Sequence, residues 1–310
     1  MLTPSTPAEN ARGILAMLTA VALFVANDAL IKLASAVFPV GQMMAVRGLM
    51  AAMLALAIVH AMGERKRLRL LAQPLVGLRG LLEAVIAFLF ITALAVIPLA
   101  DATAILQATP LILTAILVAF GLERVGWRRF LAILTGFVGV VLILRPGGAG
   151  IEPAFLLALA SAVLVAVRDL VTRMIRAEVP SIVIAFGTTI SVGLAGVLIG
   201  LLGGEDWQGL GRLESLYLVA AAVLVVSANI ALVMAFRRAD ISVVSPFRYA
   251  SVLLALAIGV VVFGDVPDAI AILGFVLVVG AGLYSVHRER VRRRAIAAAH
   301  APAAGTGAAP

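Results

Sequence analysis

Long apolar runs alternate with short polar segments through almost the whole chain. A helix needs about 20 predominantly apolar residues to cross a bilayer. Runs of about this length lie at 13–33, 40–62, 76–97, 100–120, 130–144, 154–175, 182–202, 216–236, 242–263 and 269–286. They are too long and continuous for the alternating ten-residue strands of a membrane barrel. The pattern therefore predicts an all-α integral membrane protein with ten transmembrane helices.

Composition agrees with this prediction. Only 13% of the 310 residues are charged and 63% are hydrophobic, whereas soluble domains are about 25% charged. The net charge of +8 does not indicate nucleic acid, because the basic residues form short clusters between apolar runs, with no basic face or aromatic platform. The absence of cysteine excludes disulfides and thiolate metal sites. We expect no cofactor and no metal.

The basic residues also predict the orientation of the chain. Clusters at 65–69, 124–129, 237–238 and 288–294 all fall on the same side if the ten spans alternate in direction. The opposite side holds few basic residues and carries acidic loops. Because cytoplasmic loops are enriched in Lys and Arg, we expect both termini to be cytoplasmic, in a cell (inner) membrane. A cleaved signal peptide is not expected, because the first run carries Asp28 and Lys32.

Polar landmarks recur at a nearly constant shift along the chain. Asn27-Asp28 with Lys32 corresponds to Arg168-Asp169 with Arg173 at a shift of 141, and Asp101 corresponds to Asp240 at a shift of 139. The chain is therefore interpreted as two repeats of five helices, at 13–145 and 153–287. Because five is odd, the second repeat is inverted, as in many secondary transporters. The basic segment 288–310 is expected to end in a disordered cytoplasmic tail.

Several motifs resemble those of a known family. They are Gly121-Leu122-Glu123-Arg124, Gly136-Phe137-Val138-Gly139, Leu144-Arg145-Pro146-Gly147, Val167-Arg168-Asp169-Leu170-Val171-Thr172-Arg173 and Ser245-Pro246-Phe247-Arg248-Tyr249. Over residues 13–286 the chain resembles the drug/metabolite transporter superfamily, EamA type. The resemblance implies a carrier, in a branch that includes uptake carriers for S-adenosylmethionine and riboflavin and exporters of amino acids. Asp265 stands where the family usually has glutamate.

Two polar steps lie inside the apolar runs, Asn27-Asp28 in the first and Arg168-Asp169 in the sixth. Ionisable residues inside a membrane are costly and mark a functional site by default. The two steps lie at mirrored depths, which suits an alternating-access pathway with a gate near each mouth. The alternative is that each aspartate forms a static ion pair between two helices.

Other polar residues inside the spans complete the predicted pathway. Arg79 and Glu83 are four residues apart and are expected to pair on one helix face. If transport is proton-coupled, Glu83, Asp28 and Asp169 are the candidate protonation sites. Arg47 and Arg248 have no opposite charge one turn away, so each needs a partner on another helix, in water or on a ligand.

Aromatic and amide side chains add to this set. Arg248 between Phe247 and Tyr249 could hold an anionic group while the rings contact a flat one. Gln107 and Asn229 lie in the fourth and eighth runs, where an amide could serve the pathway or only join helices. Arg248 could also be held by loop carbonyls. The predicted pathway residues are Asn27, Asp28, Arg47, Glu83, Gln107, Arg168, Asp169, Asn229, Arg248 and Tyr249.

The function predicted is secondary transport of a small organic metabolite, amino-acid-like or aromatic and zwitterionic, through the bilayer. Uptake of S-adenosylmethionine or riboflavin is the alternative. No Walker loop, protease motif or hydrolase motif is present, so an enzyme is not expected, and no filter-like loop favours a channel. Spans five and ten carry no charge, so we expect them on the outside of the bundle, where a homodimer would form if the protein is not a monomer.

Overall fold

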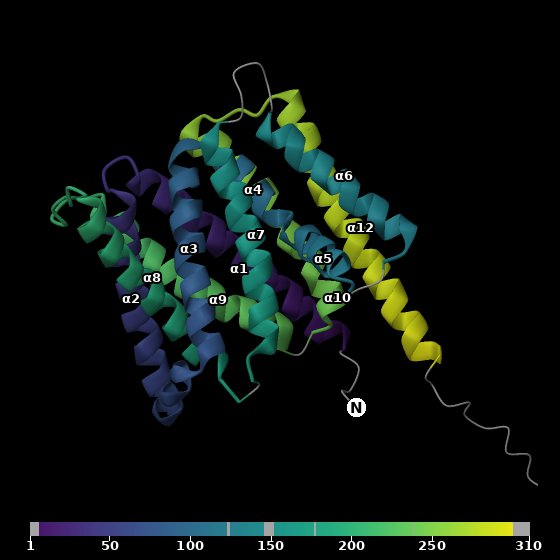
Figure 1. Cartoon of the computed structure of the whole chain (residues 1–310), viewed down its shortest axis with the longest axis horizontal. Coiled ribbons are helices and arrows are strands. Elements are labelled where there is room, and N and C mark those ends of the chain that lie inside the picture. The colour runs from purple at the N-terminus through teal and green to yellow at the C-terminus, as the bar shows by residue number, and fades with distance from the viewer. Residues whose placement is uncertain (1–5, 123–124, 146–151, 177, 238, 300–310) are drawn as a thin grey trace, which may run out of the picture.

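The computed structural model describes residues 6–122, 125–145, 152–176, 178–237 and 239–299. It contains ten helical segments long and apolar enough to cross a membrane (Figure 1). They are α1 (Pro7–Ala34), α2 (Val40–Ala61), α3 (Pro74–Val96), α4 with α5 (Leu99–Gln107 and Thr109–Ala119), α6 (Trp127–Leu144), α7 (Pro153–Met174), α8 (Ser181–Gly203), α9 (Ser215–Arg237), η2 with α11 and η3 (Ser245–Tyr249, Ala250–Ile258 and Gly259–Phe263), and α12 (Ala269–Ala299). Two short helices, η1 (Glu64–Ala72) and α10 (Ile241–Val244), lie between spans. The part of the chain that the structure describes has no strand, and the predicted all-α fold with ten spans is confirmed.

Local chemistry sets several helix ends. The Thr6 hydroxyl accepts from the Glu9 backbone N–H while the Glu9 carboxylate accepts from Thr6, a capping box that starts α1 earlier than its apolar run. Gly204 and Gly264 follow α8 and η3 with φ of 61° and 71°. Only glycine adopts this left-handed conformation without strain, so both helices end there.

The C-terminal segment differs from its expectation. α12 continues as helix to Ala299, so residues 295–299, which follow Arg294 and were expected to be disordered, are helical together with the basic segment 288–294. Alanine and arginine, which dominate this stretch, are strong helix formers. Residues 300–310 lie outside the described residues, as do Glu123-Arg124 and Pro146-Gly147 of two motifs and Arg238 of a basic cluster.

Spans four and nine are broken helices. The fourth changes from α4 to α5 at Ala108, directly before Thr109-Pro110. The ninth begins as the 3₁₀ turn η2, which contains Pro246, and ends in a π-helical turn. Proline lacks a backbone donor and its ring clashes with the preceding turn, which accounts for a break in each span.

The packing of the helices is symmetric between the two halves. α1 packs on α9, and its repeat counterpart α7 packs on α3 in the same way. α2, α4 and α6 each pack on their own counterparts, α8, α11 and α12. This pattern is the one expected for two inverted five-helix repeats related by a pseudo-two-fold axis.

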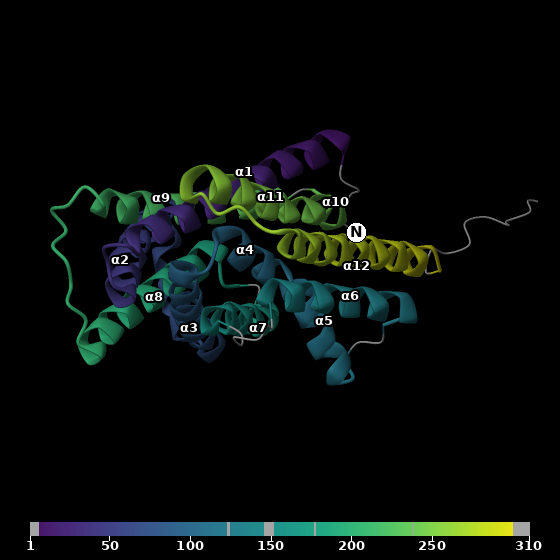
Figure 2. The ribbon, with the colours of Figure 1, turned by 90° about the horizontal axis from the view of Figure 1, so that it is seen from above.

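α6 and α12 lie side by side at one edge of the bundle (Figures 1 and 2). The Arg129 guanidinium pairs with Glu289 at 3.2 Å, and that of Arg145 pairs with Asp268 at 3.0 Å. Because Arg129 is near the start of α6 and Glu289 is far along α12, the two helices are antiparallel. This is the direction that inverted repeats require.

Glycines bring α2 and α8 close together. A Cβ atom added to Gly48 would lie 2.6 Å from the Gly193 backbone nitrogen, and one added to Gly196 would lie 2.6 Å from the Gly41 carbonyl oxygen. Small residues at such positions let membrane helices pack backbone to backbone. Replacement of either glycine by a larger residue would therefore push α2 and α8 apart.

Candidate functional site

The two ends of the bundle are named here by residues. The Lys32 end is where α1 and α3 end and α2 begins, and the Arg129 end is where α6 begins. The Asn27-Asp28 step lies about 10 Å along α1 from the Lys32 end, and the Arg168-Asp169 step lies about 9 Å along α7 from the opposite end. The two steps are therefore at mirrored depths.

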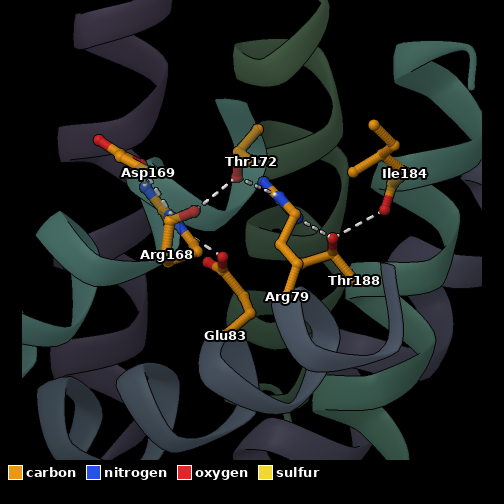
Figure 3. Close-up of polar contacts among 7 residues, drawn as sticks. All are labelled: Arg79, Glu83, Arg168, Asp169, Thr172, Ile184 and Thr188. Atoms are coloured by element: carbon orange, nitrogen blue, oxygen red, sulfur yellow. Dashed lines mark hydrogen bonds and ion pairs between the residues drawn. The ribbon is translucent and has the colours of Figure 1, made fainter. Parts of the chain in front are cut away.

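Arg168 on α7 lies between two carboxylates (Figure 3). Its Nη1 atom is 2.9 Å from Oε2 of Glu83 on α3, and its Nη2 atom is 2.7 Å from Oδ1 of Asp169. All three side chains are only partly exposed. An arginine fork that donates to two carboxylates forms charge-assisted hydrogen bonds, which are stronger than neutral ones.

Arg79 does not form the predicted ion pair with Glu83. Its Nε atom donates to the Thr172 hydroxyl on α7 at 3.0 Å, and its Nη1 atom donates to the Thr188 hydroxyl on α8 (Figure 3). Glu83 instead meets Arg168, because α3 packs directly on α7. Neither threonine was predicted as a site residue, since a hydroxyl within an apolar helix usually bonds to its own backbone.

The first polar step forms a second layer. Nδ2 of Asn27 donates to Oδ1 of Asp28 at 2.8 Å, and Nη1 of Arg47 on α2 approaches Oδ1 of Asn27 at 3.4 Å. Of the partners considered for Arg47, on another helix, in water or on a ligand, the structure shows one on another helix, Asn27 of α1. The buried Nε atom of Arg47 has no hydrogen-bond partner among the described residues.

Arg47 and Glu83 connect the two layers. The Arg47 guanidinium interacts electrostatically with both Asp28 and Glu83, and Glu83 in turn pairs with Arg168. The structure thus brings six predicted site residues together: five of them are charged and follow one another with alternating sign, and the sixth, neutral Asn27, bonds to Asp28. We call these six residues the polar network: Asn27, Asp28, Arg47, Glu83, Arg168 and Asp169.

Gln107 and Arg248 meet where the two broken spans cross. The Gln107 side-chain amide donates to the Arg248 backbone carbonyl at 2.7 Å. In the described part of the chain the Arg248 guanidinium forms no ion pair. Gln107 is buried at the end of α4, and Arg248 lies in η2, so each sits at the break of its span.

Two predicted site residues, Asn229 and Tyr249, are not part of the polar network. The Asn229 amide donates to the Val225 carbonyl of its own helix at 2.7 Å. Tyr249 is buried against Gly282 of α12, where a larger residue would collide with its ring. The Tyr249 hydroxyl has no hydrogen-bond partner within the described residues.

Further contacts that the sequence did not predict join helices at the Lys32 end. Nζ of Lys32 donates to the carbonyls of Leu94 and Ile97 at 3.0 and 2.7 Å, which ties α1 to the end of α3. The Glu205 carboxylate accepts from the backbone N–H groups of Gly41 and Gln42 at 2.9 and 3.2 Å. A carboxylate at a helix N-terminus is favourable because it satisfies free donors and faces the positive end of the helix dipole.

Metal binding has no support in this arrangement. Across the described ranges, no group of three or more His, Cys, Asp or Glu side chains could hold a metal ion. The side chains of the polar network can instead bind and exchange partners by hydrogen bonds and ion pairs.

Comparisons with known proteins agree with this architecture. The model of the EamA-like transporter family matches residues 11–145 and again residues 152–286. A riboflavin transporter from Vibrio cholerae is 30% identical over 276 residues, which cover 86% of this chain and 90% of that protein. An S-adenosylmethionine uptake transporter from Rickettsia bellii is 23% identical over 64% of this chain and 67% of that protein. The pseudopaline exporter CntI of Pseudomonas aeruginosa is 26% identical over 86% and 93%.

A solved crystal structure has the same fold. It aligns with a TM-score of 0.62 and 23% identity, and the match covers 92% of this chain and 99% of the other. The family match spans both halves, and the relatives named above are transporters rather than enzymes. The chain therefore belongs to the EamA-like transporter family and is a multi-pass membrane transporter of a small metabolite.

Proposed function

We propose that the protein is a secondary transporter that works by alternating access, with the two repeats rocking about the crossing of the broken spans. The polar network carries this proposal. It runs from the Asn27-Asp28 step to the Arg168-Asp169 step through Arg47 and Glu83, so exchange of ion-pair partners along it can accompany the opening of either end. If the ion pairs only held helices together, there would be no reason for them to link the Asn27-Asp28 step near one end of the bundle to the Arg168-Asp169 step near the other.

The charge of the network favours a zwitterionic or aromatic organic substrate. Three of its members are carboxylates and two are arginines, and Arg79 supplies a third guanidinium beside them. A zwitterion can replace partners of both signs without leaving a buried charge unpaired, whereas a simple ion would leave one sign uncompensated. Amino-acid-like compounds meet this requirement, whereas a flat polar heterocycle without charge would interact with the network through hydrogen bonds.

Riboflavin uptake is the second candidate. It is favoured by the Vibrio relative, whose similarity extends through both repeats. The exposed ring of Phe247 next to Arg248 is a surface on which a flat heterocycle could stack. S-adenosylmethionine, which is zwitterionic and carries a flat base, belongs to the same candidate group.

A ligand-stabilisation experiment tests the substrate class. The purified protein is heated with riboflavin, S-adenosylmethionine, a set of amino acids, or inorganic phosphate and sulfate as controls. A ligand that binds the folded state raises its melting temperature, and the increase grows with the ratio of ligand concentration to Kd. Stabilisation by an organic compound of the proposed class, followed by its uptake into proteoliposomes, supports the proposal. Stabilisation by the inorganic anions alone would contradict it.

Energy coupling, orientation and assembly belong to the same proposal. We expect proton coupling through Asp28, Glu83 or Asp169, since these carboxylates lie inside the spans. From the positive-inside rule we expect the Arg129 end to face the cytoplasm, with the protein in the inner membrane. If the protein forms a homodimer, the edge made by α6 and α12 is the expected contact.

A further inference from the structure

A groove of about 410 Å³ lies between α6 and α12, away from the polar network. Its wall on α6 is formed by Trp127, Leu131 and Thr135, which recur every four residues and so share one helix face. Its wall on α12 includes Gly280 and Tyr284. Both helices cross the membrane at the edge of the bundle, so the groove opens toward lipid.

Gly280 keeps the groove open. A Cβ atom added at this position would meet no atom within 4 Å. The glycine is therefore not needed for helix packing, in contrast to Gly139 and Gly274, where an added Cβ atom would lie within 3 Å of the neighbouring backbone. A larger side chain at position 280 would extend into the groove without displacing protein.

The mouth of the groove has the chemistry of a membrane interface. Trp127 is 67% exposed and begins α6, and Tyr284 is 40% exposed across from it. Tryptophan and tyrosine concentrate at the level of lipid headgroups. The Arg128 guanidinium lies 5.2 Å from the centre of the Trp127 ring, so a cation sits at the same level. Thr135 is about 12 Å deeper along the helix.

We propose that the groove binds an anionic phospholipid, with its phosphate at Arg128 and an acyl chain along Leu131, Thr135 and Gly280. Charge complementarity selects this occupant. Arg128 forms no ion pair within the described residues, and the nearby acidic residue Glu289 is already paired with Arg129. Basic pockets between transmembrane helices on the cytoplasmic side are suited to anionic headgroups. A zwitterionic lipid would gain less from the same cation.

Tryptophan quenching by brominated lipid tests the proposal. The chain has two tryptophans, Trp127 and Trp207, so Trp207→Phe leaves Trp127 as the reporter beside the groove. The protein is placed in phosphatidylcholine vesicles in which a tenth of the lipid is either brominated phosphatidylglycerol or brominated phosphatidylcholine. We expect about fivefold stronger enrichment of phosphatidylglycerol at Trp127, the ratio that one nearby cation supplies. Equal quenching by the two lipids would overturn the proposal.

Two pairs of variants locate the effect. Gly280→Leu fills the groove and should remove the preference, whereas Gly77→Leu should preserve it, because Gly77 is also an exposed helical glycine with no atom near its added Cβ. Arg128→Gln should remove the preference, and Arg69→Gln, at an exposed position in η1, should not. An unchanged preference in Gly280→Leu would contradict the groove as the site. Insensitivity of Trp127 to every brominated lipid would show that a second copy of the chain covers the groove instead.

Discussion

The Gln107 side-chain amide donates to the Arg248 backbone carbonyl at 2.7 Å, and these residues are 141 positions apart. The same shift relates Asp28 to Asp169. Gln107 and Arg248 are thus repeat counterparts that contact each other, which places both close to the pseudo-two-fold axis. Because each lies at the break of its span, the axis passes close to the break in both helices.

Replacement of Gln107 by leucine should therefore disturb the crossing of the broken spans. The variant leaves the Arg248 carbonyl without its donor, which we expect to lower the free energy of unfolding by about 1 kcal/mol, the scale of an interhelical hydrogen bond in a membrane. Transport should fall even where the folded protein remains stable, because the lost bond joins the two repeats at the proposed pivot. Thermal unfolding in detergent and uptake into proteoliposomes measure the two effects.

Thr92→Val is the matched control for this variant. The Thr92 hydroxyl bonds to the Phe88 carbonyl of its own helix, so its removal breaks no contact between repeats. Stability and transport should both remain near those of the unmodified protein. Equal loss of transport in Thr92→Val and Gln107→Leu would contradict a special role for the crossing.

The ion pair between Glu83 and Arg168 can be separated into structural and transport roles by a double-mutant cycle. Arg168→Gln alone leaves Glu83 and Asp169 without their cation, and removal of one partner of a buried pair costs about 3–5 kcal/mol. Glu83→Gln should cost less, because Arg168 keeps Asp169 as a partner. The double variant should be more stable than Arg168→Gln, because only Asp169 then lacks its cation. We expect it to remain inactive in uptake, since partner exchange along the polar network needs both charges.

The measurement is the melting temperature of the four proteins together with their uptake rates in liposomes. A coupling free energy well above zero with no transport in the double variant is the expected result. Wild-type transport by the double variant would show that the ion pair has only a structural role, holding α3 against α7.

The sequence predicted the ten spans because each is a continuous apolar run of the length that a bilayer requires. It also indicated the inversion, from the spacing of Asp28 and Asp169 and the odd number of spans in each half. Pro110 and Pro246 gave a visible signal for the broken helices. The helical extension of α12 was missed because an alanine-rich and arginine-rich tail has the same composition whether it is helical or disordered.

Which charged residues pair with each other was harder to predict from the sequence. Arg79 and Glu83 share a face of α3, so an ion pair within the helix was the natural prediction. The actual partner of Glu83 is on α7, and which residue of α7 meets it depends on the relative rotation and height of two packed helices. Those quantities follow from side-chain packing between distant segments, for which a single sequence carries no local signal. The predicted partner of Arg47 was likewise limited to the statement that it lies on another helix, in water or on a ligand.

Gly48→Ala should strongly destabilise the contact between α2 and α8. Its new methyl group would lie 2.6 Å from the Gly193 backbone nitrogen, so the two helices must move apart. We expect a loss of about 1–3 kcal/mol, the usual cost of overpacking a tight contact. Gly77→Ala is the control, since its methyl group meets no atom within 4 Å and alanine favours the helix by up to about 1 kcal/mol. Equal melting temperatures of the two variants would show that the helices can separate freely.

Proton coupling through the polar network predicts a defined loss in two variants. Asp28→Asn and Asp169→Asn each keep a hydrogen-bonding side chain but cannot take up and release a proton. We expect the variant that has lost the coupling carboxylate, Asp28→Asn or Asp169→Asn, still to exchange substrate across the membrane. The same variant should fail to accumulate substrate when a pH gradient is imposed on proteoliposomes. Asp268→Asn is the control, because Asp268 pairs with Arg145 at an exposed position outside the network. Collapse of the gradient by nigericin should abolish accumulation by the unmodified protein and by the control. Accumulation that persists after nigericin is added would refute proton coupling. Asp28, Glu83 and Asp169 would then have a role in binding alone.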